Sequence, residues 1–271
     1  MLRVEHVRKR FGGVLAVSDA SLTAEAGRIT ALIGPNGAGK TTLFSIISGF
    51  LSPDAGSVFH GGTDITGMPP HLLARRGIAR TFQIAQPFAG LTVHENIAVG
   101  AHLSRRSRAA ALAAAADVAG LVGLGGLLDR RASSLTTAGT KRLEVARALA
   151  TGPDLLLLDE VLAGLNPAEV AAMVPMIRGI AERGITILMI EHVMQAVMSL
   201  AEHVFVLVEG RIVAAGGPQD VAGNARVIEA YLGHGAAARL ASAADLKFLH
   251  TCRKLVSGTS NRKAALEPYT C

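Results

Sequence analysis

The sequence predicts an α/β fold with a mostly parallel sheet, and three observations support this fold class. Short apolar runs alternate with segments of helical spacing, and these runs lie at 29–33, 155–158, 186–190 and 204–208. The run at 155–158 consists of leucine alone, which is typical of a strand buried on both faces. A glycine-rich loop joins the run at 29–33 to helical spacing at 41–50, as in a tight strand-to-helix connection.

The N-terminal part of the chain predicts an antiparallel β subdomain beside this sheet. Residues 2–25 alternate apolar and polar side chains around a turn at Gly12-Gly13, which indicates paired strands with one solvated face. Residues 57–65 contain a second turn signal, Gly61-Gly62, and predict another hairpin.

The middle of the chain predicts a helical subdomain at about 84–150. Alanine and leucine dominate residues 109–128, and both residue types favour helix. Two further helices are expected at 168–183 and 194–201, where they would cover the sheet.

The expected domain organisation is one large domain, residues 1–233, followed by an extension at 234–271. The extension carries many small and polar residues, so we expect it to be weakly ordered.

The composition narrows the class of partner. The chain has 271 residues, of which 50% are hydrophobic, and a formal net charge of +6. An excess of positive charge suits an acidic ligand such as a nucleotide, a nucleic acid or an anionic lipid, without choosing among them. Charged residues make up only 18% of the chain, which indicates surface shared with a partner.

The expected compartment is the reducing cytoplasm. The two cysteines, Cys252 and Cys271, predict neither a disulfide framework nor a C-x-x-C metal pair. The first residues lack the apolar core of a signal peptide. Apolar stretches such as 185–190 are too short to span a bilayer, so we expect any work at a membrane to be done from its surface.

The glycine-rich loop matches the phosphate-binding pattern G-x-x-x-x-G-K-[ST] at every fixed position. Its glycines allow backbone N–H groups to approach a polyphosphate, and the following helix N-terminus adds a favourable dipole. Lys40 supplies a positive charge for the β- and γ-phosphates, and the Thr41 hydroxyl is a ligand for Mg²⁺. The predicted nucleotide-binding residues here are Gly34, Pro35, Asn36, Gly37, Ala38, Gly39, Lys40, Thr41 and Thr42.

Two carboxylates, Asp159 and Glu160, follow the leucine strand directly. They emerge at its carboxyl end, where open α/β sheets place their ligands. We predict that Asp159 holds Mg²⁺ through water and that Glu160 orients and deprotonates the attacking water.

Four further segments resemble the ABC ATPases in particular. Gln83, in Arg80-Thr81-Phe82-Gln83, resembles the Q-loop glutamine, which implies contact with the metal and the attacking water and a link to a transmembrane partner. His192 follows a predicted strand and resembles the switch histidine that contacts the γ-phosphate. Phe11 resembles the aromatic residue that stacks on adenine. The fourth segment resembles the D-loop, which crosses the dimer interface in the family, and consists of Ala163, Gly164, Leu165 and Asn166.

The resemblance implies ATP and Mg²⁺ as ligands. It implies catalytic roles for Glu160, His192 and Gln83. The implied metal ligands are Thr41, Gln83 and Asp159.

Within the family, the chain resembles the ATP-binding subunits of branched-chain amino-acid importers from residue 2 to about 233. The stretches that carry this resemblance are KRFGGVLAVSDASL, GIARTFQIAQPFAGLTVHENI, LLLLDEVLAGLNPAE and IEHVMQAVMSLAEHVFVLVEGRIVAAGGP. It implies a peripheral motor on the cytoplasmic face of the cell membrane. The implied partners are integral permease subunits, a second ABC ATPase subunit that is identical or related, and indirectly a periplasmic or surface binding protein. The cargo stays open between branched-chain amino acids and related small molecules.

The signature segment departs from the family pattern. ABC ATPases carry a stretch close to L-S-G-G-Q before a helix, and the corresponding residues are Leu135, Thr136, Thr137, Ala138 and Gly139. In the family this helix N-terminus faces the γ-phosphate bound by the other subunit. The methyl group of Ala138 either crowds that approach or is tolerated in an ordinary helical backbone. We predict slower turnover at the site that uses this segment.

Two other functions compete with transport. An ABC ATPase that acts on ribosomes or nucleic acid is the main alternative, but such relatives carry two cassettes or a long coiled-coil insertion, and this chain has one cassette and no heptad run. The basic cluster at 105–108 has no interleaved aromatic residues, so a nucleic-acid partner is not expected. A binding module without catalysis is disfavoured because Lys40, Asp159 and Glu160 are all present.

Overall fold

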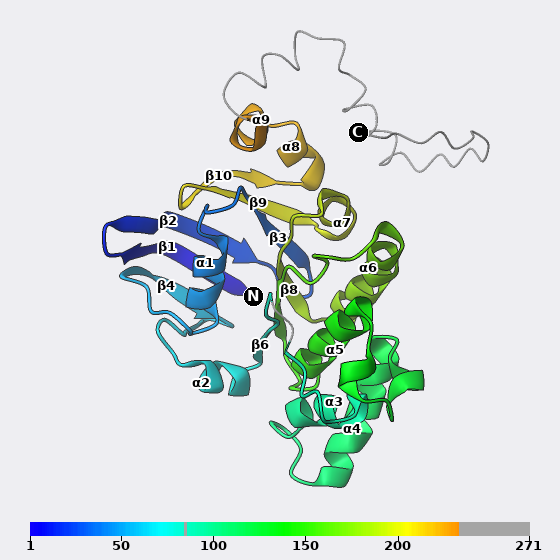
Figure 1. Cartoon of the computed structure of the whole chain (residues 1–271). Coiled ribbons are helices and arrows are strands. Elements are labelled where there is room, and N and C mark those ends of the chain that lie inside the picture. Colours follow the sequence, from blue (N-terminus) through cyan, green and yellow to red (C-terminus); the bar gives the residue numbers. More distant parts are fainter. Residues whose placement is uncertain (84–85, 233–271) are drawn as a thin grey trace, which may run out of the picture.

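A computed structural model describes residues 1–83 and 86–232, so the predicted extension at 234–271 lies outside the described residues. The strands form one ten-stranded sheet in the order β5-β4-β1-β2-β10-β9-β3-β8-β7-β6, and helices lie against it (Figure 1). The predicted α/β class is confirmed, with a parallel part and an antiparallel part in the same sheet.

The parallel part of the sheet carries the predicted site at its carboxyl ends. Its strands are β3 (Ile29–Ile33), β6 (Ile78–Arg80), β7 (Leu155–Asp159), β8 (Thr186–Ile190) and β9 (His203–Val208). Every residue of β3, β7 and β8 is buried, which explains why their sequences are apolar without alternation. Leu32 and Asp159 both pair with Ile190, so the segments that follow these three strands emerge together.

The antiparallel part begins at the N-terminus, as predicted. Its strands are β1 (Leu2–Phe11), β2 (Val14–Ala24), β4 (Ala55–His60), β5 (Thr63–Asp64) and β10 (Arg211–Gly216). β10 pairs with β9 and also meets β2 through Arg211 and Asp19, so it joins the two parts.

The helices pack on two faces of the sheet. They are α1 (Lys40–Ile47), α2 (Pro70–Arg75), α3 (Val93–Ala101), α4 (Arg108–Leu121), α5 (Thr137–Leu149), α6 (Pro167–Ala181), α7 (Met194–Leu200), α8 (Pro218–Ala222) and α9 (Ala225–Leu232), with 3₁₀ turns at Gly125–Leu127 and Ala132–Ser134. Buried residues of α1 share a core with β1 and β2, whereas buried residues of α3 to α7 share a second core. The phosphate-loop helix α1 and the signature helix α5 therefore lie on opposite faces of the sheet (Figure 1).

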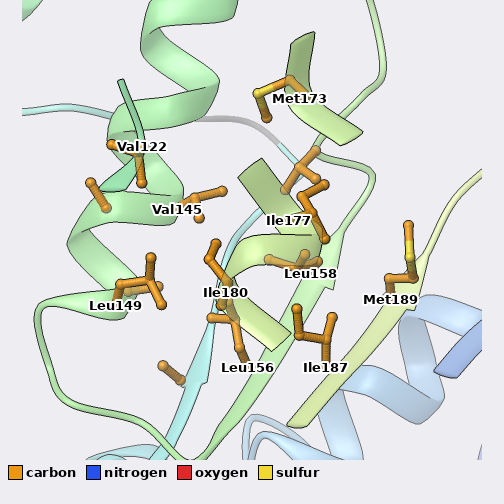
Figure 2. Close-up of a cluster of buried hydrophobic side chains, with 14 of the residues drawn as sticks. Val122, Val145, Leu149, Leu156, Leu158, Met173, Ile177, Ile180, Ile187 and Met189 are labelled. Atoms are coloured by element: carbon orange, nitrogen blue, oxygen red, sulfur yellow. The ribbon is translucent and has the colours of Figure 1, made fainter. Parts of the chain in front are cut away.

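Strand β7 separates these two cores. Leu155 and Leu157 belong to the core beneath α1, and Leu156 and Leu158 belong to the core beneath α5 and α6. Figure 2 shows Leu156 and Leu158 close to Ile180 of α6. Because side chains alternate along a strand, a run of four leucines fills both cores at once.

The structure corrects several predicted boundaries. The helix expected at 41–50 ends at Ile47, because Gly49 adopts a φ of 75° and a Cβ there would lie 2.2 Å from the Met68 carbonyl oxygen. The helix expected at 109–128 ends at Leu121, shortly before Gly123 at a φ of 73°. Strands β6 and β10 were not predicted, since β6 has only three residues and both lie outside the long apolar runs.

Within residues 1–83 and 86–232, none of the helices combines the length and the apolar character needed to cross a membrane.

Candidate functional site

The phosphate loop connects β3 to α1. Gly39 is the N-cap of α1 in a left-handed conformation, with a φ of 101°, and no described side chain caps the helix. The first amides of α1 therefore have no side-chain partner among the described residues, and such amides are typical donors to a bound anion.

Glycine is required at both ends of this loop. A Cβ on Gly34 would lie 2.0 Å from the Leu207 carbonyl oxygen, and a Cβ on Gly39 would lie 2.3 Å from the Ala16 carbonyl oxygen. Both glycines also have positive φ values that side chains rarely allow. The loop is thus packed directly against the backbone of neighbouring strands.

Lys40 is buried beneath the loop. Its ammonium donates hydrogen bonds to the carbonyl oxygens of Gly34 at 2.8 Å and Pro35 at 3.0 Å. Burial lowers the pKa of Lys40, and the negative charges of Glu160 and Asp159 oppose this shift. The two predicted carboxylates are therefore close enough to act electrostatically on the predicted phosphate-binding lysine.

Asp159 is 2% exposed and forms an ion pair with Arg80 of β6, with 2.7 Å between Oδ2 and Nη2. The Arg80 guanidinium also donates to the Ser48 hydroxyl at 2.9 Å and lies 5.5 Å from the centre of the Phe82 ring. Arg80 thus provides a buried carboxylate with an opposite charge, without which burial at this depth would be costly. A role for Arg80 was not predicted from the sequence; its signal is a positively charged residue at the end of a short strand that pairs with β7.

Glu160 is brought together with two other predicted catalytic residues. Its Oε2 accepts a hydrogen bond from Gln83 Nε2 at 2.8 Å, and its Oε1 lies 2.8 Å from His192 Nε2. Glu160 itself has a φ of 51°, which is uncommon for a residue with a side chain. The structure thus places Gln83, Glu160 and His192 in one hydrogen-bonded group.

Lys141 of α5 connects this group to the helical region. The residue is 7% exposed, and its ammonium donates to the carbonyl oxygens of Gln83 at 3.1 Å and Glu160 at 3.4 Å. One helical turn further, the Glu144 carboxylate accepts from the amide of Phe82, and burial raises the pKa of Glu144. Neither residue was predicted; their signal is a lysine and a glutamate three residues apart, with apolar Leu143 and Val145 flanking the glutamate.

Phe11 lies at the tip of the β1–β2 hairpin, paired with Val14, and is 45% exposed. The same hairpin contacts the phosphate loop through Ala16, whose carbonyl faces Gly39. An exposed ring on the hairpin that contacts the phosphate loop is compatible with the predicted stacking role, which stays a prediction.

The signature segment forms the start of α5. Thr136 is its N-cap, and the threonine hydroxyl accepts from the amide of Gly139 at 3.2 Å. Thr137 and Ala138 lie in the first turn of the helix, and Ala138 has no positive φ. Of the two outcomes considered for the Ala138 methyl group, the structure shows an ordinary helical backbone within this chain.

The predicted D-loop lies between β7 and α6. Ala163, Gly164 and Asn166 are exposed, and Leu165 is half-buried. The Asn166 side chain caps α6 by accepting from the amides of Ala168 and Glu169, both at 3.0 Å.

A groove of about 840 Å³ is lined by all three predicted metal ligands, Thr41, Gln83 and Asp159. Its walls also include three exposed aromatic residues, Phe50, Phe82 and Phe88. The rings of Phe50 and Phe82 meet edge to face, with centroids 5.6 Å apart. The groove therefore joins the predicted site to an apolar surface.

A phosphate loop between a buried strand and a helix, with two carboxylates at a parallel strand end on the same edge, defines a P-loop NTPase. Residues 17–163 match the family described as ABC transporter, and residues 211–237 match one described as Branched-chain amino acid ATP-binding cassette transporter. The chain belongs to the ABC transporter family and is an ATP-hydrolysing subunit of that class.

Several relatives support this membership. The chain is 39% identical over 251 residues to the high-affinity branched-chain amino acid transport ATP-binding protein BraF of Pseudomonas aeruginosa, covering 86% of this chain and 98% of the relative. It is 38% identical over 249 residues to the corresponding protein LivG of Escherichia coli, with the same coverage.

The fold is also similar to solved structures. A nucleotide-free ATP-binding cassette from an ABC transporter superposes with a TM-score of 0.79 at 33% identity, covering 86% of this chain and 99% of that one. The CbiO1 protein of Clostridium perfringens superposes with a TM-score of 0.77 at 26% identity, covering 92% and 98%.

Proposed function

We propose that this chain drives a membrane importer for branched-chain amino acids or related small molecules by hydrolysing Mg-ATP with Glu160 as the general base. The observation that carries the proposal is the position of the Glu160 carboxylate, held by Gln83 and His192 at the end of β7. The names of BraF and LivG support the cargo, since both are described as branched-chain amino acid transport proteins.

The residues at this strand end fit Mg²⁺. A hydroxyl, a carboxylate and an amide oxygen are hard ligands of the kind that Mg²⁺ takes, and Thr41, Asp159 and Gln83 supply them along one groove. Among the residues that the structure describes, no cluster of three or more His, Cys, Asp or Glu side chains forms a metal site. A metal here would thus also depend on phosphate oxygens. When bound, Mg²⁺ neutralises charge on the β- and γ-phosphates.

Glu160 has the position of a general base. It takes a proton from water while the water oxygen bonds to the γ-phosphorus and the bond to the β–γ bridging oxygen breaks, giving ADP and inorganic phosphate. His192 and Gln83 orient the carboxylate, because each contacts a different oxygen of it. Lys40 holds the β- and γ-phosphates, and Phe11 stacks on the adenine.

Each complete site is formed by two chains. The helices α1 and α5 lie on opposite faces of the sheet, which favours a signature segment that acts on a nucleotide bound elsewhere. The exposed D-loop at 163–166 is suited to an interface between two such subunits. The second subunit is either an identical copy or a related ABC ATPase.

The permease docks in the groove beside Gln83. Phe50, Phe82 and Phe88 present an apolar surface of the kind that a membrane partner covers. Because Gln83 lines the same groove and bonds Glu160, occupation of the groove is linked to the proposed base. In this proposal the chain works on the cytoplasmic side of a cell membrane, and a binding protein on the opposite side delivers the cargo.

A pull-down tests this function. The tagged full chain is captured from detergent-solubilised membranes of the host, and its partners are identified by mass spectrometry. We expect integral permease subunits and an ABC ATPase, either a sister protein or a second copy. Phe50→Ala should reduce permease recovery, while Leu121→Ala, at an exposed residue of α4, should leave it unchanged. Recovery of ribosomes or nucleic-acid proteins without a permease would contradict the transport function.

A further inference from the structure

Glu191 is a buried carboxylate outside the nucleotide-binding motifs. It follows β8 directly and is 1% exposed. Its Oε1 accepts a hydrogen bond from the amide of Leu162 at 2.9 Å, two residues after Glu160. Burial raises the pKa of Glu191 to about 7, and the charge of Glu160 acts in the same direction. A carboxyl group at this position therefore lowers the stability of the fold through its desolvation, a free-energy cost that an apolar side chain would avoid.

The turn that Glu191 contacts has unusual backbone geometry. Glu160, its first residue, has a φ of 51°, and such a conformation persists only when its surroundings enforce it. The amide of Glu160 donates to the Ile190 carbonyl oxygen at 3.0 Å, and His192 Nε2 lies 2.8 Å from Glu160 Oε1. Residues 190, 191 and 192 thus contact this turn in succession, through a carbonyl, a carboxylate and an imidazole.

Helix α5 contributes a further contact to the turn. Lys141 Nζ donates to the Glu160 carbonyl oxygen at 3.4 Å, and the charge of Lys141 favours the ionised form of Glu191. Leu162 also directly precedes the exposed D-loop at 163–166. The bond from Leu162 to Glu191 is therefore the buried anchor between the proposed base and the proposed dimer interface.

We propose that Glu191 is a positioning residue for ATP hydrolysis, which holds the turn at 160–162 so that the Glu160 carboxylate lies between Gln83 and His192. It acts through the backbone of Leu162 and contacts neither nucleotide nor water. The inference rests on the proposed role of Glu160 as the general base.

The test compares two substitutions at this position. Glu191→Ala removes the acceptor for the Leu162 amide, and we expect kcat to fall at least about tenfold, because a small displacement of a base is costly. The nucleotide Kd, measured with a fluorescent ADP analogue, should change less than about twofold, since the phosphate loop is untouched. Glu191→Gln keeps an oxygen acceptor, so kcat should return to within about threefold of the parent value. No loss of kcat in a folded Glu191→Ala protein would overturn the proposal.

A matched control lies at the other end of the same strand. Thr186 is 4% exposed, and its hydroxyl accepts from the amide of Gly27 at 3.1 Å. Thr186→Val removes a similar buried bond to the backbone but at the end of β8 away from Glu160, so kcat should stay at the parent value. An equal loss of kcat in Thr186→Val would show that general damage to β8 explains the effect.

A double-mutant comparison separates this inference from the proposed function. In a Glu160→Gln background, Glu191→Ala should lower the residual single-turnover rate less than about twofold, because the base it positions is gone. A full tenfold loss in that background would contradict positioning through Glu160. If Glu160→Gln alone retains the parent rate, the general-base proposal fails, and no Glu191 variant is needed to see it.

Discussion

Two helix N-termini that face nucleotide in ABC ATPases are built in different ways in this chain. Helix α1 begins after Gly39, in a left-handed conformation and without a side-chain cap from any described residue. Helix α5 begins after Thr136, which has extended angles and caps the helix with its own hydroxyl. The amides of α1 thus keep their hydrogen-bonding capacity for a ligand, whereas one amide of α5 is already bonded within the chain.

The glycines of the two segments show the same contrast. A Cβ on Gly39 would lie 2.3 Å from a backbone oxygen, whereas a Cβ on Gly139 would lie 3.3 Å from the Leu135 side chain, in a normal helical conformation. A loop that wraps a phosphate needs glycine for its own fold, while a capped helix end does not. The backbone of α5 therefore does not require glycine in its first turn, where Ala138 lies in an ordinary helical conformation.

The largest expected effect is the loss of hydrolysis at the nucleotide that the chain's own phosphate loop binds. Glu160→Gln should lower kcat by about 10²- to 10⁴-fold, because it removes the general base. ATP binding should persist, and the variant should accumulate as a closed dimer in ATP. ATPase assays and size-exclusion chromatography measure both. Glu182→Gln, at the exposed end of α6, is the control. Hydrolysis at the parent rate would exclude Glu160 as the base.

A pair of glycine substitutions tests the contrast directly. Gly39→Ala places a methyl group against the Ala16 carbonyl at a φ of 101°, so we expect ATP affinity to fall more than about tenfold from strain of about 1–3 kcal/mol and displacement of the loop. Gly139→Ala should leave affinity at the chain's own phosphate loop unchanged. Titration with a fluorescent ATP analogue measures both. Equal ATP affinities in the two variants would contradict the proposed difference between the phosphate loop and the signature segment.

Loss of the α5 cap should affect stability more than nucleotide binding. Thr136→Ala removes the bond to the Gly139 amide and should cost about 1 kcal/mol, or about 2–4 °C in Tm. Thr137→Ala, one residue further and exposed, should change Tm less. Thermal unfolding followed by circular dichroism measures the shift. A Tm unchanged by Thr136→Ala would show that the cap is dispensable.

The smallest effect concerns the rate of the partner's site. Ala138→Gly should modestly speed hydrolysis at the site that uses this signature, because a closer approach of the helix N-terminus becomes available. Glycine in the first turn should cost about 0.5–1 kcal/mol of stability. Single-turnover hydrolysis in a dimer whose other site carries Glu160→Gln isolates that rate. An unchanged rate would show that the methyl group is harmless.

Most of the fold was predictable because its signals are local. The strands β3 and β8 match their predicted ranges, since continuous apolar runs between turn signals leave few alternatives. Strand β6 was missed because three residues carry too little periodicity. Its pairing with β7, which is a tertiary contact, is what brings Arg80 to Asp159.

The predicted site residues were identifiable for a related reason. A phosphate loop and a strand-end carboxylate pair encode their chemistry in consecutive residues, so Lys40 and Glu160 are visible without a structure. Lys141 and Glu191 were missed because the residues that connect them to the site, Gln83, Glu160 and Leu162, lie at least nineteen residues away in the chain. The local sequence does not predict which backbone amide or carbonyl will form a hydrogen bond with a buried charged side chain.

The sequence by itself determined the class of this protein: its strand pattern, its phosphate loop and its acidic pair, because each depends on neighbours in the chain. The tertiary structure alone decided how these parts meet. It placed α1 and α5 on opposite faces of the sheet, paired Arg80 with Asp159 and set Glu191 beneath the turn that carries Glu160. These contacts depend on which strands lie side by side, and that arrangement is fixed by packing two cores around one sheet rather than by any single segment.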